Sequence, residues 1–203
     1  MDKWTFNKGV VMNAGFLETM KMDNFTCYVF HDVDMVPETD LALYNCPPSA
    51  QEMVHMAVSV SRWKYRLTYT NYLGGIVLMS PDTFVTIGGF SNSFWGWGGE
   101  DDDLYCRVTR KNISIVRYLD LGEKTVTNCS LRRPPGRIAR FRMLKHDLVQ
   151  QNPELRELNE MSKDNKLEND GVDSLQYDLK KIEEFSLFTK IKINLAAPKK
   201  VNK

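Results

Sequence analysis

The chain alternates short apolar runs with polar turns and with pairs of glycine or proline, a pattern typical of an α/β protein. Apolar positions spaced as on one face of a helix run through residues 6–22, where Asn7 is the candidate N-terminal cap. Gly74 and Gly75 interrupt one long apolar run, and glycines inside a strand mark a bulge or the close approach of a ligand. Continuous apolar runs predict buried strands at residues 27–30, 55–60, 67–79 and 113–116.

The remaining segments predict helices, loops and a C-terminal hairpin. Ser80 is expected to cap a short helix, because proline fits the first helical position that follows it. Further helices are predicted at residues 39–44, 101–111 and 152–161, extended chain at 140–146, and two antiparallel strands at 174–195. A loop is predicted at residues 118–133 and a frayed basic tail at 196–203.

Composition limits the classes of protein to which this chain can belong. Its 203 residues are enough for one domain with a real core, and we expect a single domain over residues 1–203. With 27 Lys and Arg against 26 Asp and Glu, no net field attracts nucleic acid or an acidic membrane. No apolar stretch reaches about 18 residues, so the chain as written is expected to lack a membrane anchor. Its start also lacks the apolar core of a signal peptide.

Other features argue for a secretory compartment. Asn24, Asn112 and Asn128 each begin a triplet that fits the N-glycosylation pattern. The four cysteines have no C-x-x-C spacing, which disfavours zinc and leaves room for one or two disulfides. Because these features do not match the missing leader, we expect the chain to be a fragment of a longer protein.

The densest chemical signal is the sequence FWGWGGEDDD at residues 94–103. Packing explains it poorly, because adjacent carboxylates repel one another and ordered glycine costs entropy. A calcium loop spaces its acidic ligands at alternate positions, which this run does not. The run fits a site for sugar hydroxyls better, in which one carboxylate acts as the general base.

The two tryptophans of this motif have two interpretations. Trp95 and Trp97 are either core anchors or, because glycines flank them, parts of a mobile loop that closes over a substrate. Aromatic faces stack on the apolar sides of sugar rings, and Trp63, Tyr69 and Tyr72 are candidates for the rest of such a wall.

A second acidic pair, Asp32 and Asp34, follows the first predicted strand, at the end where open α/β sheets bind ligands. The pair is either a solvated turn or part of a divalent-metal site. His146, with Met143 three residues before it, favours a metal such as manganese. Sugar-nucleotide diphosphates need such an ion to neutralise the leaving phosphates. The other two histidines, which lack an acidic partner at ligand spacing, are expected to be structural.

Together these motifs resemble the β-1,4-galactosyltransferase family over nearly the whole chain. The matching segments are FHDVD at 30–34, YLGG at 72–75, GGF at 88–90, WGWGGEDDD at 95–103, MLKH at 143–146, DGVDSL at 170–175 and LFTKI at 187–191. The resemblance implies a nucleotide-diphospho-sugar transferase fold of the GT-A type, with a mixed central sheet flanked by helices. It also implies that the first nucleotide-binding strand and an upstream anchor are missing here.

The resemblance assigns roles to individual residues. It implies that Asp34, Met143 and His146 bind Mn²⁺, and that Asp101 is the base, with Glu100 as a second catalytic candidate. The remaining implied roles are donor binding by Phe6, Lys8, Asp32, Gly75 and Trp97, acceptor binding by Tyr69, Tyr72, Trp97, Asp101 and Asp102, and a disulfide between Cys27 and Cys46.

The implied reaction is inverting transfer of galactose from UDP-galactose to the 4-hydroxyl of a terminal N-acetylglucosamine, on a protein or lipid glycan in the Golgi lumen. Tyr72 favours galactose over N-acetylgalactosamine, whose transfer is the alternative. Lys8 stands where the family usually has arginine, so the charge stays and the bidentate fork is lost. Residues 118–133 have no counterpart in the family. The competing hypothesis is a truncated, non-catalytic glycan-binding or partner-binding module.

Overall fold

The computed structural model describes residues 6–40, 42–118, 130–131, 139–145 and 150–195. The chain forms two compact units, and each is described by itself. The first unit comprises Met1–Asn24, Gly88–Asp103 and Val149–Lys203, and the second comprises Phe25–Ile87 and Leu104–Leu148. That residues 1–203 form one catalytic domain stays a prediction.

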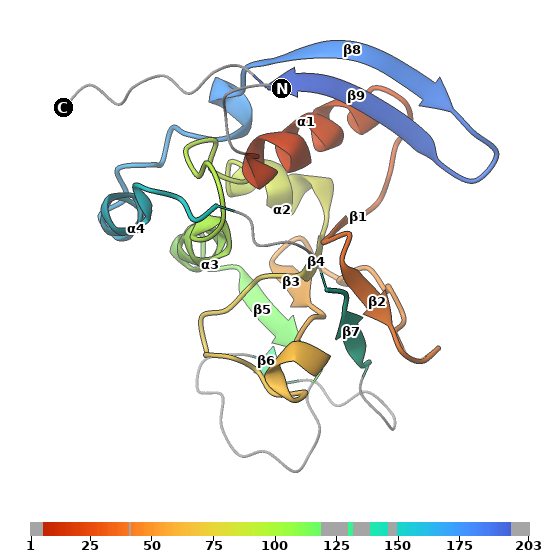
Figure 1. The fold of residues 1–203 in the computed structure, drawn as a ribbon, viewed down its shortest axis with the longest axis vertical. Helices are drawn as coiled ribbons and strands as arrows, with labels where there is room; N and C mark the ends of the chain where they lie inside the picture. The colour runs from red at the N-terminus through yellow and green to blue at the C-terminus, as the bar shows by residue number, and fades with distance from the viewer. Residues whose placement is uncertain (1–5, 41, 119–129, 132–138, 146–149, 196–203) are drawn as a thin grey trace. The chain divides into compact units, whose positions relative to one another are not determined.

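A five-stranded mixed sheet forms the centre of the second unit (Figure 1). Its order is β1 (Tyr28–His31), β4 (Ile76–Met79), β3 (Glu52–His55), β5 (Ser114–Arg117) and β6 (Ser130–Leu131). Strand β4 runs antiparallel to both β1 and β3, whereas β3, β5 and β6 pair in parallel. The sheet confirms the mixed arrangement that the resemblance implies.

A two-stranded ribbon and two short helical segments complete the second unit. In the ribbon, β2 (Met35–Pro37) pairs antiparallel with β7 (Phe141–Met143). The helical segments are η1 (Ser61–Trp63) and α2 (Pro81–Thr86), and Ser80 caps α2 as predicted. Phe84 of α2 stacks on Phe30 of β1 with ring centroids 4.5 Å apart, so α2 packs on the sheet. The unit's main core cluster contains Met35, Val54, Met56, Ala57, Val60, Ile76, Leu78, Val116 and Phe141.

Three predictions for this unit were wrong. The strand predicted at residues 55–60 ends at His55, and residues 56–60 turn through the core with a single isolated β-bridge, from Val60 to Phe141. Of the long run at 67–79, only Ile76–Met79 forms a strand. Residues 39–44 form no helix where the structure describes them. Apolar runs report burial, which loops that cross a core share with strands.

Cys27 and Cys46 form the disulfide that the resemblance implies, with their Cα atoms 5.7 Å apart. The bridge links residues separated by 19 positions and encloses β1 and β2. Cys106 is a free cysteine.

Replacing Cys27 with serine is expected to lower the free energy of unfolding by about 3 kcal/mol, because the open chain regains loop entropy when it unfolds. Urea unfolding followed by circular dichroism measures the change. The matched control is Cys106→Ser, which removes a thiol without opening a loop. Equal losses in the two variants would contradict this account of the disulfide.

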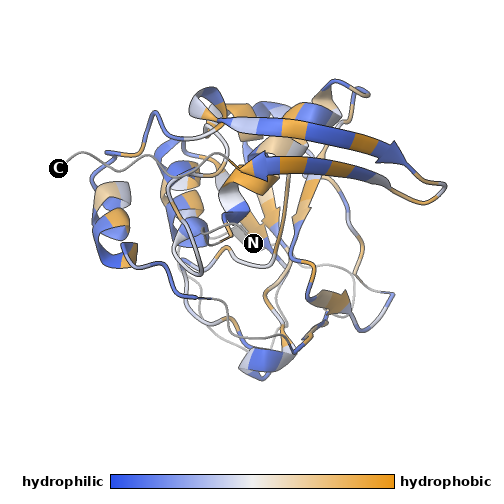
Figure 2. Ribbon diagram, turned by 45° about the horizontal axis from the view of Figure 1, so that its top comes forward, coloured by the Kyte–Doolittle hydropathy of each residue, from blue (hydrophilic) through white to orange (hydrophobic). Residues whose placement is uncertain are grey.

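The first unit contains helix α1 (Lys8–Met20), helix α4 (Leu155–Lys163), the turn η2 (Val172–Ser174) and the hairpin of β8 (Tyr177–Glu184) and β9 (Thr189–Leu195). Asn7 caps α1 as predicted, since its Oδ1 accepts from the Val10 N–H at 3.0 Å. Helix α1 lies against the hairpin (Figure 1), and hydrophobic and hydrophilic residues alternate along both strands (Figure 2). The hairpin confirms the two antiparallel strands predicted at residues 174–195.

Helix α3 (Glu100–Arg110) begins in the first unit and continues into the second. Within the described parts of the chain, no helix has the length and apolar character needed to cross a membrane. The predicted loop at residues 118–133 and the tail at 196–203 lie mostly outside the described residues. Ser130–Leu131 corrects that loop prediction locally, because these residues pair with the edge of β5 as strand β6.

Candidate active site

The glycine-rich segment at residues 88–99 needs glycine for close packing as well as for its turns. Gly96 has φ of 88°, and a Cβ there would lie 2.7 Å from the carbonyl oxygen of Gln150. Gly99 has φ of 92°, and a Cβ there would lie 2.6 Å from both the Phe94 ring and the Leu155 side chain. A larger residue at either position would push the motif off its supports, so the glycines do more than provide hinges.

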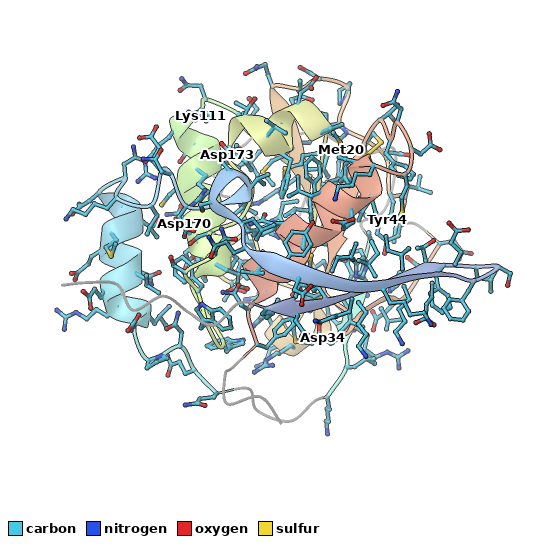
Figure 3. The ribbon with its side chains drawn as sticks, turned by 90° about the horizontal axis from the view of Figure 1, so that it is seen from above. Met20, Asp34, Tyr44, Lys111, Asp170 and Asp173 are labelled. Atoms are coloured by element: carbon cyan, nitrogen blue, oxygen red, sulfur yellow. A yellow bond between two sulfur atoms is a disulfide. The ribbon has the colours of Figure 1, made fainter. Side chains whose placement is uncertain are left out.

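Hydrogen bonds fix the chain just before the Trp-Gly-acid motif. The Asp170 carboxylate accepts from the hydroxyls of Ser91, at 2.5 Å, and Ser93, at 2.8 Å. It also accepts from the backbone N–H of Asn92 at 3.1 Å. Asp170 directly precedes the turn η2, where Figure 3 labels it beside Asp173. No sequence pattern predicted a role for Asp170 in the site; the only local signal is the Asp170-Gly171 pair, which is typical of a turn.

The Trp97 backbone is held while its indole is exposed. The Trp97 N–H donates to the Gln150 carbonyl at 2.9 Å, and the Asn152 N–H donates to the Trp97 carbonyl at 3.1 Å. The residue is nevertheless 60% exposed, so it is no core anchor. Of the two interpretations of Trp97, the structure contradicts the core anchor, and the mobile loop that closes over a substrate stays a prediction.

The four acidic residues of the motif form the first turn of α3 and have different surroundings. Glu100 pairs with the Lys8 ammonium at 3.3 Å. Asp103 is buried and accepts from the Ser162 hydroxyl of α4 at 2.6 Å. Asp103 is therefore structural, whereas Glu100, Asp101 and Asp102 are partly exposed.

Asp101 has the properties of a general base. Its burial raises the pKa of its carboxyl to about 7, helped by the charges of Glu100 and Asp102 and opposed by that of Lys8. A base works best when its pKa lies close to the working pH, because it is then ionised and still basic enough to accept a proton. Perturbed carboxyls of this kind are concentrated at functional sites.

Two predicted donor-binding residues lie beside this motif in the first unit. The Phe6 carbonyl accepts from the Gly96 N–H at 2.8 Å, and the Phe6 residue is 57% exposed. Lys8 reaches the motif through its pair with Glu100. Phe6, Lys8 and Trp97 therefore lie beside the candidate acids, and their donor binding stays a prediction.

In the second unit, the β2–β7 ribbon brings two of the three predicted metal ligands together. The Asp34 carbonyl accepts from the Leu144 N–H at 2.7 Å, and Met35 stands opposite Met143 in the register. Asp34 and Met143 are therefore neighbours across the ribbon. His146, the third predicted ligand, lies outside the described residues.

The described donors fit part of a manganese site. The carboxylate of Asp34 suits a hard ion, whereas the thioether of Met143 adds a soft and weaker ligand. Arg62 Nη1 lies 3.6 Å from the Met143 sulfur, a contact that nothing in the sequence marks. Among the described residues, at this ribbon or anywhere else, no three His, Cys, Asp or Glu side chains cluster closely enough to hold a metal ion.

Gly75 and Asp32 are joined in the same unit. The Asp32 N–H donates to the Gly75 carbonyl at 2.8 Å. Gly75 has φ of 88°, and a Cβ there would lie 2.6 Å from Ala57 and 2.9 Å from Met35. A side chain at position 75 would therefore disturb the strand end that carries the acidic pair.

The predicted aromatic wall forms around Tyr72. Its ring meets those of Trp63, at 5.2 Å, and Tyr69, at 5.6 Å, both nearly edge-on. Tyr72 is buried at 8% exposure, whereas Tyr69 is 44% exposed. Tyr69 is therefore the more exposed of the two tyrosines, and the Tyr72 ring packs against both Tyr69 and Trp63.

Two glycosyltransferase family models match parts of this chain. A model described as the N-terminal region of glycosyl transferase group 7 matches residues 1–47, and one described as the N-terminal domain of galactosyltransferase matches residues 54–147. β-1,4-Galactosyltransferase 2 of Cricetulus griseus is 35% identical over 96% of this chain and 48% of its own length. Human β-1,4-galactosyltransferase 1 is 32% identical over 95% of this chain and 44% of its own length. The chain belongs to the β-1,4-galactosyltransferase family.

The chain spans about half the length of these family relatives. Two solved structures show the same fold. The first, a mutant of Drosophila β-1,4-galactosyltransferase 7 in complex with manganese, UDP-Gal and xylobiose, has a TM-score of 0.69 at 24% identity and covers 98% of this chain and 78% of that one. The catalytic domain of the same Drosophila enzyme with xylobiose has a TM-score of 0.70 at 23% identity over the same shares. The predicted GT-A-like fold is confirmed.

Proposed function

We propose that the protein to which this chain belongs transfers galactose from UDP-galactose to the 4-hydroxyl of a terminal N-acetylglucosamine, with inversion and with Mn²⁺, in the Golgi lumen. The observation that carries the proposal is Asp101, a partly buried carboxyl in the first turn of α3 whose pKa is raised to about 7 and which follows the exposed Trp97 in the same motif. The relatives are galactosyltransferases and the solved complex contains UDP-Gal, which supports galactose as the transferred sugar.

The Trp-Gly-acid motif of the first unit supplies the base in this proposal. Asp101 takes the proton from the acceptor hydroxyl, whose oxygen forms the new bond to the anomeric carbon of galactose. The bond from that carbon to UDP breaks, and the leaving diphosphate takes its electron pair. Glu100 and Asp102 accept hydrogen bonds from other hydroxyls of the acceptor, and the Trp97 indole stacks on a sugar face.

The second unit supplies the donor chemistry. Asp34 and Met143, with His146, would hold Mn²⁺, which neutralises the charge of the diphosphate when it is bound. Arg62 must leave the Met143 sulfur for this, because a guanidinium beside a metal ligand repels the ion. Tyr72, enclosed by Trp63 and Tyr69, leaves little room for an acetamido group, which favours galactose over N-acetylgalactosamine.

Manganese-dependent donor binding tests this proposal by calorimetric titration of the purified protein with UDP-galactose. Replacing Asp34 with asparagine is expected to weaken donor binding in Mn²⁺ by about tenfold or more, because the ion loses its charged ligand. The control is Asp40→Asn, which neutralises an exposed carboxylate close to the same ribbon.

Equal affinities in the two variants would refute the metal site. A folded parent protein that binds no donor would refute the enzyme proposal and leave the non-catalytic module. The transfer assay on N-acetylglucosamine, with UDP-N-acetylgalactosamine as a second donor, then decides the substrates.

A further inference from the structure

A buried arginine holds the backbone of the loop that carries Tyr69 and Tyr72. Arg117, the last residue of β5, has no exposed surface. Its Nη1 donates to the Thr70 carbonyl at 2.8 Å, and its Nη2 donates to the Tyr72 carbonyl at 2.6 Å. Arginine is almost never fully buried without partners, and here the guanidinium meets two backbone carbonyls at once.

His55 continues this set of contacts from the neighbouring strand β3. Arg117 Nε donates to His55 Nδ1 at 3.0 Å, and because an arginine nitrogen only donates, Nδ1 must accept. The hydrogen of the ring is therefore on Nε2, which donates to the Gly74 carbonyl at 3.0 Å. Burial and the charge of Arg117 lower the pKa of His55 to about 3, so the ring stays neutral near pH 7.

The held carbonyls belong to alternate residues, Thr70, Tyr72 and Gly74. This segment forms no strand ladder, so its carbonyls need donors from elsewhere once they are buried. The His55 ring also meets the Tyr72 ring at 5.5 Å, nearly edge-on. The backbone and the ring of Tyr72 are thus fixed by the same pair of side chains.

We propose that Arg117 and His55 are positioning residues for the donor sugar, acting as a clamp on residues 70–74 that sets the place of Tyr72 and of the following Gly75. The proposal rests on the proposed function. Apolar side chains could fill the volume of Arg117 and His55, but they would leave the three carbonyls without these donors. Lysine keeps the charge but is a point donor that cannot span two carbonyls.

Arg117→Lys tests the clamp through donor selectivity. The ratio of kcat/KM for UDP-galactose to that for UDP-N-acetylgalactosamine is expected to fall by about tenfold, because a loosened Tyr72 no longer limits the space at the acetamido position. The control is Val116→Ala, which shortens a buried side chain of the same strand in a core cluster that includes no residue of 70–74. That variant loses stability, yet a smaller fraction of folded protein lowers both activities equally and leaves the ratio unchanged.

Hydrogen exchange provides a readout that needs no activity. In Arg117→Lys, the amides of residues 70–75 are expected to exchange about tenfold faster than in the parent. In Val116→Ala, they are expected to exchange at the parent rate once the change in global stability is corrected for. If Arg117→Lys does not fold, His55→Gln, which breaks the second contact, is measured in its place. Unchanged selectivity and unchanged exchange in the folded variant overturn the clamp. If the parent transfers neither sugar, the proposed function fails, and the exchange data alone decide whether the clamp holds the loop.

Discussion

Replacing Asp101 with asparagine is expected to lower kcat for galactose transfer by about 10³-fold, because the amide still accepts a hydrogen bond from the acceptor hydroxyl but cannot take its proton. The KM for the acceptor is expected to change little for the same reason. Initial rates with UDP-galactose, Mn²⁺ and an N-acetylglucosaminide measure both constants. The matched control is Asp82→Asn, which changes an exposed carboxylate in the first turn of a different helix, α2.

The pH dependence of the parent protein is part of the same prediction. Burial and the neighbouring charges of Glu100 and Asp102 raise the pKa of Asp101 to about 7, so kcat is expected to fall as the pH drops below that value. The residual activity of Asp101→Asn is expected to lose this dependence. A variant that kept more than about a tenth of the parent kcat would show that another group is the base.

The stability of Asp101→Asn shows whether a loss of activity comes from the missing base or from unfolding. The folded pKa of Asp101 is raised above its ordinary value of 3.8 to about 7, so between these pH values the folded state binds a proton that the unfolded state has lost. The contribution of Asp101 to stability therefore falls as the pH rises from about 4 to about 7. Asparagine removes this titration, and the variant is expected to be at least as stable as the parent at pH 8.

Replacing Phe141 with alanine is expected to lower the free energy of unfolding by about 4 kcal/mol, because it removes a buried ring and leaves a cavity. Phe141 has no exposed surface and belongs to the core cluster of the second unit. Its N–H also donates to the Ser59 carbonyl at 3.0 Å, which limits how far the backbone can move to close the cavity. Urea unfolding measures the loss.

The control for this variant is Phe188→Ala at the tip of the β8–β9 hairpin, where the residue is 60% exposed. It is expected to cost less than about 1 kcal/mol. Because Phe141 begins the strand that carries Met143, we also expect weaker manganese-dependent donor binding in Phe141→Ala. Similar losses of stability in the two variants would show that Phe141 is not a core residue.

Local signals in the sequence determined most of the helices and the hairpin. Asn7 and Ser80 cap the helices that they were predicted to cap, because a cap depends on N–H groups two or three residues away. The alternation at residues 174–195 predicted the C-terminal hairpin for a similar reason, since the turn and both strands are contiguous in the sequence. The Trp-Gly-acid motif and the family resemblance likewise required only the order of residues.

Only the tertiary structure decided which acid of that motif is paired with another side chain and which has a raised pKa. Asp103 is paired with Ser162, 59 positions away, and Asp101 owes its raised pKa to burial and to the charges of Glu100 and Asp102, which Lys8 opposes. The apolar residues at 56–60, predicted as a strand, proved to be a turn through the core. Arg117 meets His55, 62 positions away. Burial, pKa and long-range pairing all depend on distances in space, which the fold sets and a local pattern of residues does not contain.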